Sequence, residues 1–154
     1  MRFEPNVIRV LRVAFKKLHE KAKVPSYATV GSGAFDLYAA TAQIDEPSFG
    51  VHTFGLGFAL EIPEGYGMFI LSRSGHGFKN QMRLTNCVGL IDSDYRGEVK
   101  VQLIVDTHQS AFLPDSSKAI AQGVILRIPK VEFYTVDELS ETVRGEGGLG
   151  STSL

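Results

Sequence analysis

Apolar and polar residues alternate along the stretch from Val99 to Asp106, and this alternation is the strongest secondary-structure signal in the chain. The apolar positions of the pattern are Val99, Val101, Leu103 and Val105. Successive side chains of a β-strand point to opposite faces, so these apolar side chains share one face. The pattern therefore predicts a strand with one buried face and one face in contact with solvent.

Further short stretches predict that the rest of the chain is also built from strands. They are Leu11–Phe15, Phe54–Ile62, Gly67–Leu71 and Gly123–Ile128. The sequence Pro63–Tyr66 predicts a hairpin turn, and the stretch after Ser72 predicts one short helix. Many short strands separated by turn residues are typical of an all-β sandwich or barrel.

The composition limits the kinds of partner that the chain can have. Its 154 residues suit one domain, and 16 basic against 17 acidic side chains give a net charge of −1. Without an overall positive field, binding to nucleic acid or to a membrane is not expected, and a polyanionic ligand needs a local group of Arg and Lys or a metal ion. The single cysteine, Cys87, excludes an intrachain disulfide and a thiolate-rich zinc site. The absence of a signal-peptide pattern favours a reducing, cytoplasmic location.

Carboxylates and a tyrosine lie just before the alternating strand, in the segment Asp92–Gly97. The apolar run Val88–Ile91 on its other side predicts that the segment is the bend of a hairpin. Acids on a loop between rigid strands can act as a base or contact a metal, and a solvated turn capped by its own Asp side chains fits the same residues. A calcium loop is excluded, because Arg96 and Leu103 stand where such a loop needs oxygen ligands.

Three other segments carry polar groups that have two interpretations each. Asp36 lies in an apolar run and is either a structural acceptor or part of a site. Ser74 and Gly75 follow Arg73 and form either an anion site or a capped turn. The glycine-rich segment 144–154 is either an arm that wraps a phosphate or an unstructured tail. It is neither a Rossmann motif, which needs a preceding strand, nor a P-loop, which needs Lys where Ser151 stands.

These segments occur in the order of the five motifs of the trimeric deoxyuridine triphosphatase (dUTPase) family, which the chain resembles from about Leu11 to Thr152. The matching segments are Ala34–Leu37, Arg73–Gly75, Gly89–Gly97, Ala121–Gln122 and Arg144–Thr152. The resemblance implies a jelly-roll-like β domain over residues 1–139, with a short extension at 1–9, and a flexible arm over 140–154. It also implies a homotrimer with shared active sites, which hydrolyses dUTP to dUMP and pyrophosphate with Mg²⁺ on the triphosphate.

The resemblance also implies a role for each matching residue. Asp92 would activate the attacking water, and Arg73 would act beside it at the phosphates. Tyr95 would pack under the deoxyribose, and Asp36 would support the metal through water. Asn86 and the backbone of a hairpin at Thr85–Ile91 would read the uracil. The substrate-binding set besides Tyr95 is Ser74, Gly75, Asn86, Gly89, Ile91, Gln122, Arg144, Gly148, Leu149, Gly150, Ser151 and Thr152.

Some positions depart from the family pattern. Leu149 stands where an aromatic ring usually stacks on the uracil, a contact worth about 0.5–1.5 kcal/mol beyond burial. Ala119 replaces a basic residue, Ser72 replaces a proline, and Ser153 follows the Ser-Thr pair in place of glycine. Asp92 and the other central residues are kept, so the resemblance implies an active enzyme.

Other functions remain as alternatives at this point. A dCTP deaminase, which is similar in fold, would attack the base instead of phosphorus, and the run Asp92–Tyr95 together with the complete arm favours the phosphatase. A binding module for a regulatory protein partner has no positive support in the sequence. A purely structural jelly-roll protein would not explain acids, tyrosine and arginine at all five motif positions.

Overall fold

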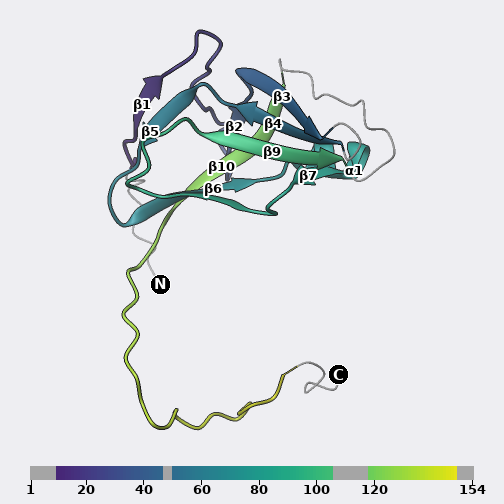
Figure 1. Ribbon diagram of the computed structural model, residues 1–154. Helices are drawn as coiled ribbons and strands as arrows, with labels where there is room; N and C mark the ends of the chain where they lie inside the picture. Colours follow the sequence, from purple (N-terminus) through teal and green to yellow (C-terminus); the bar gives the residue numbers. More distant parts are fainter. Residues whose placement is uncertain (1–9, 47–49, 106–117, 149–154) are drawn as a thin grey trace.

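The computed structural model describes residues 10–46, 50–105 and 118–148, and it consists of β-strands with one short helix (Figure 1). No helix in these residues is long and apolar enough to cross a membrane. The strands are β1 (Ala14–Lys17), β2 (Phe35–Tyr38), β3 (Thr41–Glu46), β4 (Val51–Gly55), β5 (Phe58–Glu61), β6 (Tyr66–Leu71), β7 (Met82–Leu84), β8 (Gly89–Ile91), β9 (Lys100–Val105) and β10 (Ala119–Arg127), and the helix is α1 (Ser74–Asn80).

The strands form two four-stranded sheets and one smaller sheet, all antiparallel. The first sheet has the order β2-β10-β6-β8, the second has the order β3-β4-β9-β7, and β1 pairs with β5. The chain passes repeatedly between the sheets, so their apolar faces enclose a common core. The prediction of an all-β, jelly-roll-like fold with one short helix is confirmed, and the described sheets form an open sandwich instead of a closed barrel.

The core is made of apolar side chains that the two large sheets bury against each other. On β9, Val101, Leu103 and Val105 are at most 4% exposed, whereas Lys100 and Gln102 are exposed. The predicted alternation is therefore confirmed. The first sheet contributes Leu37, Met68, Ile70, Ile120 and Ala121 to the same cluster. Burial of each large side chain contributes about 1.5–3 kcal/mol, which makes this cluster the main source of stability.

The predicted strand Phe54–Ile62 is in fact two strands, β4 and β5. The chain kinks between them at Gly57, whose φ of +72° suits glycine. A Cβ at this position would lie 2.7 Å from the Cβ of Ala40 and 2.8 Å from that of His19, so glycine also permits a close approach of these segments. The kink takes the chain out of the second sheet, so β4 pairs with β3 and β9 whereas β5 pairs with β1.

The predicted hairpins are wrong as pairings, although the turns exist. Pro63–Tyr66 forms a turn in which the Tyr66 N–H donates to the carbonyl of Pro63 over 3.2 Å, but β5 and β6 lie in different sheets. The segment Asp92–Gly97 joins β8 to β9, and the segment Thr85–Val88 joins β7 to β8, again across the two sheets. In a sandwich a strand pairs with strands distant in sequence, and a local turn signal does not specify them.

The ends of several elements also differ from the expected bounds. β1 begins at Ala14 instead of Leu11, and β10 begins at Ala119 instead of Gly123. The short helix is confirmed as α1, and its C-cap residue, Gln81, has a left-handed conformation with φ of 51°. Beyond β10 the chain leaves the sheets, and residues 129–146 are exposed and extend away from the sandwich (Figure 1).

Candidate active site

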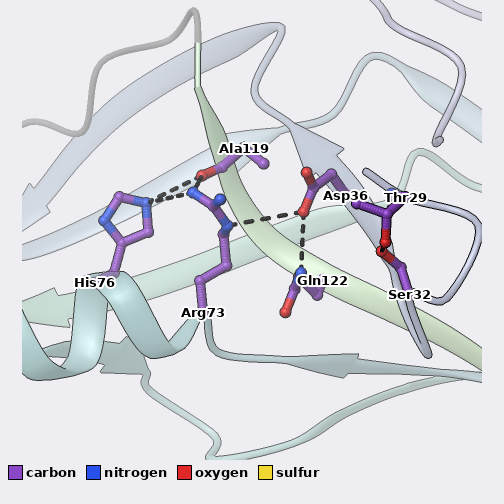
Figure 2. Close-up of polar contacts among 7 residues, drawn as sticks. All are labelled: Thr29, Ser32, Asp36, Arg73, His76, Ala119 and Gln122. Carbon is purple, nitrogen blue, oxygen red and sulfur yellow. Dashed lines mark hydrogen bonds and ion pairs between the residues drawn. The ribbon is translucent and has the colours of Figure 1, made fainter. Parts of the chain in front are cut away.

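Three polar side chains from distant parts of the chain meet at one end of the first sheet. Asp36 lies on β2 and Gln122 lies opposite it on β10, while Arg73 follows β6 (Figure 2). The amide of Gln122 donates to Oδ1 of Asp36 over 3.1 Å, and Nε of Arg73 lies 3.8 Å from the same oxygen. Asp36 is 8% exposed, so these contacts offset the cost of burying its charge. We call Asp36, Arg73 and Gln122 the polar cluster.

Arg73 is held in place by the start of α1 and by β10. It is the N-cap of the helix, with an extended backbone and no side-chain cap, and its Nη1 donates to the carbonyl of Ala119 over 2.7 Å. His76 lies beside it, with Nε2 3.0 Å from the same carbonyl. Ser74 and Gly75 are exposed on this first turn. His76 was not predicted to lie here, because a lone histidine without a spaced partner gives no signal in the sequence.

Asn86 and Gly89, two of the residues expected to read a base, border one pocket. The pocket has a volume of about 330 Å³ and lies where β6, β7 and β9 meet, with Ile70 and Val101 among its lining residues. Asn86 is exposed, and its carbonyl accepts a hydrogen bond from the Val88 N–H over 2.6 Å. The segment Thr85–Val88 therefore folds as a tight turn that presents backbone groups at the mouth of the pocket.

The segment Asp92–Gly97 is a compact, exposed loop that directly follows β8, whereas Asn86 precedes this strand. The Tyr95 N–H donates to the carbonyl of Asp92 over 3.3 Å, and Nη1 of Arg96 donates to the carbonyl of Ser93 over 2.6 Å. Asp92 and Asp94 are exposed and border a groove of about 1060 Å³. Ile91, the last residue of β8, is partly buried beside them.

The register of the first sheet separates this loop from the polar cluster. Asp92 directly follows β8, whose last residue pairs with Met68 of β6, whereas Gln122 pairs with Leu71 at the far end of β6. β8 and β2 are the outer strands of this four-stranded sheet. Spacings of about 3.3 Å per residue along strands and about 4.8 Å between strands put Asp92 roughly 17 Å or more from Asp36. One chain therefore does not bring Asp92 and the polar cluster into a single site.

The arm lies apart from both groups. Nε of Arg144 donates to the carbonyl of Gly147 over 2.8 Å, and the Gly147 N–H donates to the carbonyl of Arg144 over 3.0 Å, which makes a small local turn. Arg144 and Gly148 are exposed. The other predicted arm residues, Leu149, Gly150, Ser151 and Thr152, lie outside the described residues.

A divalent metal would find few protein ligands in the described part of the chain. No group of three His, Cys, Asp or Glu side chains there could hold an ion. Asp36 offers one buried carboxylate, whose Oδ1 already contacts Gln122 and Arg73. Magnesium usually keeps several waters and binds through one or two carboxylates plus phosphate oxygens. The polar cluster therefore fits a metal that is carried by a triphosphate, and does not fit a closed protein metal centre.

Comparisons with known proteins show which family the chain resembles. The sequence matches the dUTPase family model over residues 20–153. It is 41% identical over 142 residues to the deoxyuridine 5′-triphosphate nucleotidohydrolase of Nautilia profundicola, with 92% of this chain and 99% of that protein covered. The enzyme of the same name from Dictyoglomus turgidum is 40% identical over 149 residues, which cover 94% of this chain and 100% of that protein.

A solved structure has the same fold. The dUTPase of Staphylococcus bacteriophage 80alpha with dUPNHPP superposes with a TM-score of 0.78, at 25% identity, and the match covers 93% of this chain and 99% of that one. The family model covers most of the chain, and the relatives in Nautilia profundicola and Dictyoglomus turgidum align over nearly their whole lengths. The chain belongs to the dUTPase family.

Proposed function

We propose that the protein hydrolyses dUTP to dUMP and pyrophosphate in the cytoplasm, which limits uracil incorporation into DNA and supplies dUMP for dTMP synthesis. The observation that supports this best is the polar cluster. The cluster joins three residues that the sequence places in separate motifs. Two of them lie on the neighbouring strands β2 and β10, and the third lies at the start of α1. An arginine and an amide that are fixed beside a buried carboxylate suit a site for phosphate oxygens.

We infer that the active form is a homotrimer in which each site combines residues of different subunits. The separation between Asp92 and the polar cluster supports this, because both are needed at the same α-phosphate. The exposed segment 129–146 supports it too, since Phe133, Tyr134 and Leu139 in it are 93%, 82% and 87% exposed. Large apolar side chains in an extended segment are a sign of a surface that another chain covers.

In the proposed reaction Asp92 accepts a proton from the water that attacks the α-phosphorus. Its carboxylate is exposed, so a water molecule can reach it and transfer a proton to it directly. The bond between the α-phosphorus and the bridging oxygen then breaks, and pyrophosphate leaves. Negative charge at the phosphates would be met by Arg73, Gln122, Arg144 and the backbone N–H groups of Ser74 and Gly75. Magnesium on the triphosphate, with Asp36 as its contact through water, would supply further positive charge.

Selection of the substrate would use the pocket beside β8. Backbone groups and the amide of Asn86 would pair with the uracil edge, and Gly89, which lines the pocket, would shape the space around it. Ile91, two residues further along β8, would add to this wall. A site built to pair with one base edge rejects another, because its polar groups are then left unpaired. A thymine methyl would be refused by the limited volume, and Tyr95 would fill the space that a ribose 2′-OH needs.

The arm would close over the bound substrate and exclude water. Arg144, Ser151 and Thr152 would contact the phosphates, while Gly148 and Gly150 allow the backbone to approach them closely. Leu149 would cover the base in place of an aromatic ring. Closure strengthens every electrostatic contact inside the site, because it replaces water with fixed protein dipoles.

The reaction can be tested by hydrolysis of dUTP in ¹⁸O-labelled water. Attack at the α-phosphorus places the label in dUMP and none in pyrophosphate. Label in pyrophosphate would overturn the proposed point of attack, and release of ammonia from dCTP would favour a deaminase instead. Neither readout depends on how fast the protein works.

Arg73 and Asp92 provide a test of the shared site. We expect Arg73→Ala alone to lower kcat/KM for dUTP about 10²–10³-fold, because it removes a fixed cation from the phosphate site. When Arg73→Ala and Asp92→Asn subunits are mixed and allowed to exchange, activity should return to about a quarter of the unaltered level, since a quarter of the sites receive both intact residues.

The matched control for this experiment is Arg127→Ala, which removes an exposed arginine at the far end of β10. This variant should keep its activity. Its mixture with Asp92→Asn should show only the activity that comes from the intact Asp92 residues of the Arg127→Ala subunits. If the mixed inactive variants stay inactive although mass spectrometry detects mixed oligomers, then Arg73 and Asp92 act in the same subunit and the shared site is wrong.

A further inference from the structure

Glu98 connects the loop that carries Tyr95 to the kink at Gly57. Its side-chain Oε1 accepts a hydrogen bond from the Gly57 N–H over 3.0 Å. Its backbone carbonyl accepts a hydrogen bond from the Tyr95 hydroxyl over 3.1 Å. A single residue therefore links the tyrosine to a segment that is distant in the sequence.

The Gly57 end of this link is rigid. Gly57 has a positive φ, and its backbone lies so close to Ala40 that an added Cβ would clash with it. Its carbonyl also accepts a hydrogen bond from the Leu18 N–H over 2.8 Å. On the other side of Glu98, the Val99 N–H donates to the carbonyl of Phe58 over 2.9 Å, and Val99 is fully buried. Glu98 is therefore attached to fixed backbone through its side chain and through its neighbour.

The Tyr95 end depends on few contacts. Tyr95 is 45% exposed, so the core does not hold it. Its ring lies over Gly97, where an added Cβ would clash with the hydroxyl oxygen and with Cζ of Tyr95. The bare backbone of Gly97 and the carbonyl of Glu98 thus set where the ring lies relative to the loop.

We propose that Glu98 is a positioning residue for Tyr95 and that it thereby sets how strongly the protein discriminates against a ribose 2′-hydroxyl. The proposal rests on the proposed function, in which Tyr95 packs under the deoxyribose. A steric filter works only while its wall stays in place, because van der Waals contact is largely lost once a gap of about 0.5–1 Å opens. The carboxylate of Glu98 points to Gly57 and would not touch the substrate.

The test is the ratio of kcat/KM for UTP to kcat/KM for dUTP. In Glu98→Ala the Gly57 N–H loses its acceptor and the loop loses one of its two attachments to fixed backbone, so the ratio should rise about tenfold, the change expected when a close steric fit is relaxed. Glu98→Gln keeps a side-chain carbonyl oxygen at the same place and should restore the ratio to within about twofold of the unaltered protein. If Glu98 had a purely structural role, Glu98→Ala would lower the amount of folded protein. The apparent kcat/KM would then fall equally for both substrates, and the ratio would stay unchanged.

Gly97→Ala gives a second route to the same readout without touching the carboxylate. Its new Cβ must displace the Tyr95 ring, so the ratio should rise as in Glu98→Ala. Tyr95→Ala serves as the reference. If Tyr95→Ala raises the ratio and Glu98→Ala does not, the proposal for Glu98 is overturned and the proposed function stands. If Tyr95→Ala leaves the ratio unchanged, the role of Tyr95 in the proposed function is overturned, and the proposal for Glu98 with it.

Discussion

Replacement of Asp92 by Asn is expected to lower kcat for dUTP about 10³-fold and to leave the KM nearly unchanged. The amide has the size and shape of the carboxylate but cannot accept the proton of the attacking water. A loss of this size corresponds to about 4 kcal/mol of transition-state stabilisation. Steady-state kinetics would measure both constants, and direct titration with a non-hydrolysable dUTP analogue would show that binding is kept.

The matched control is Asp94→Asn, a second exposed acid in the same loop. It removes the same charge from nearly the same place, so it separates proton transfer from a general change in the local field. We expect less than about a threefold change in kcat for this variant, in line with the small effect of exposed charges. The Asp92 side chain makes no hydrogen bond or ion pair within the described residues, and the melting temperature of Asp92→Asn should therefore match that of the unaltered protein. Equal kcat for Asp92→Asn and the unaltered protein would remove Asp92 from its role.

Deletion of residues 144–154 should reduce dUTP hydrolysis at least 100-fold while the fold is kept. The deletion removes one arginine, the glycines and the hydroxyls that would enclose the phosphates, so the open site would stay in contact with water. Arg144 and its neighbours are exposed and contribute nothing to the buried core. Changes at such positions usually alter stability by less than about 0.5 kcal/mol, so the melting temperature should move by only a few degrees.

A shorter deletion that removes only Ser153 and Leu154 is the control, because it keeps every arm residue with a proposed phosphate contact. Its activity should stay close to that of the full chain. Full activity of the 144–154 deletion would show that the arm is an unstructured tail. A large fall in its melting temperature would show instead that the segment is part of the folded domain.

The sequence predicted best those features that depend on which face of a strand is buried. The alternation at 99–105 is confirmed because a two-residue period reports burial directly. The sequence allows two interpretations of Asp36, a structural acceptor or a site residue. Its carboxylate accepts a hydrogen bond from Gln122 and lies beside Arg73. The two interpretations therefore coincide, because the residues that Asp36 contacts as a structural acceptor are also residues of the candidate site.

The sequence predicted least well those features that depend on long-range register. The turn at 92–97 was expected to close a hairpin, but β8 and β9 pair with strands of different sheets. His52 is another example, since it is 1% exposed and both of its ring nitrogens lack a hydrogen-bond partner among the described residues. Glu98 and His76 gave no signal either, because their partners, Gly57 and Ala119, are distant in the sequence and present only backbone groups.

The most direct test of the central claim is pyrophosphate release from dUTP with Mg²⁺, with UTP, dCTP and dTTP measured in parallel. The proposed function predicts rapid release from dUTP, and release at least about 100-fold slower from each of the other three. That result would support the reaction, the selection of uracil and the selection of deoxyribose together. No release from any of the four by a correctly folded protein would contradict the account.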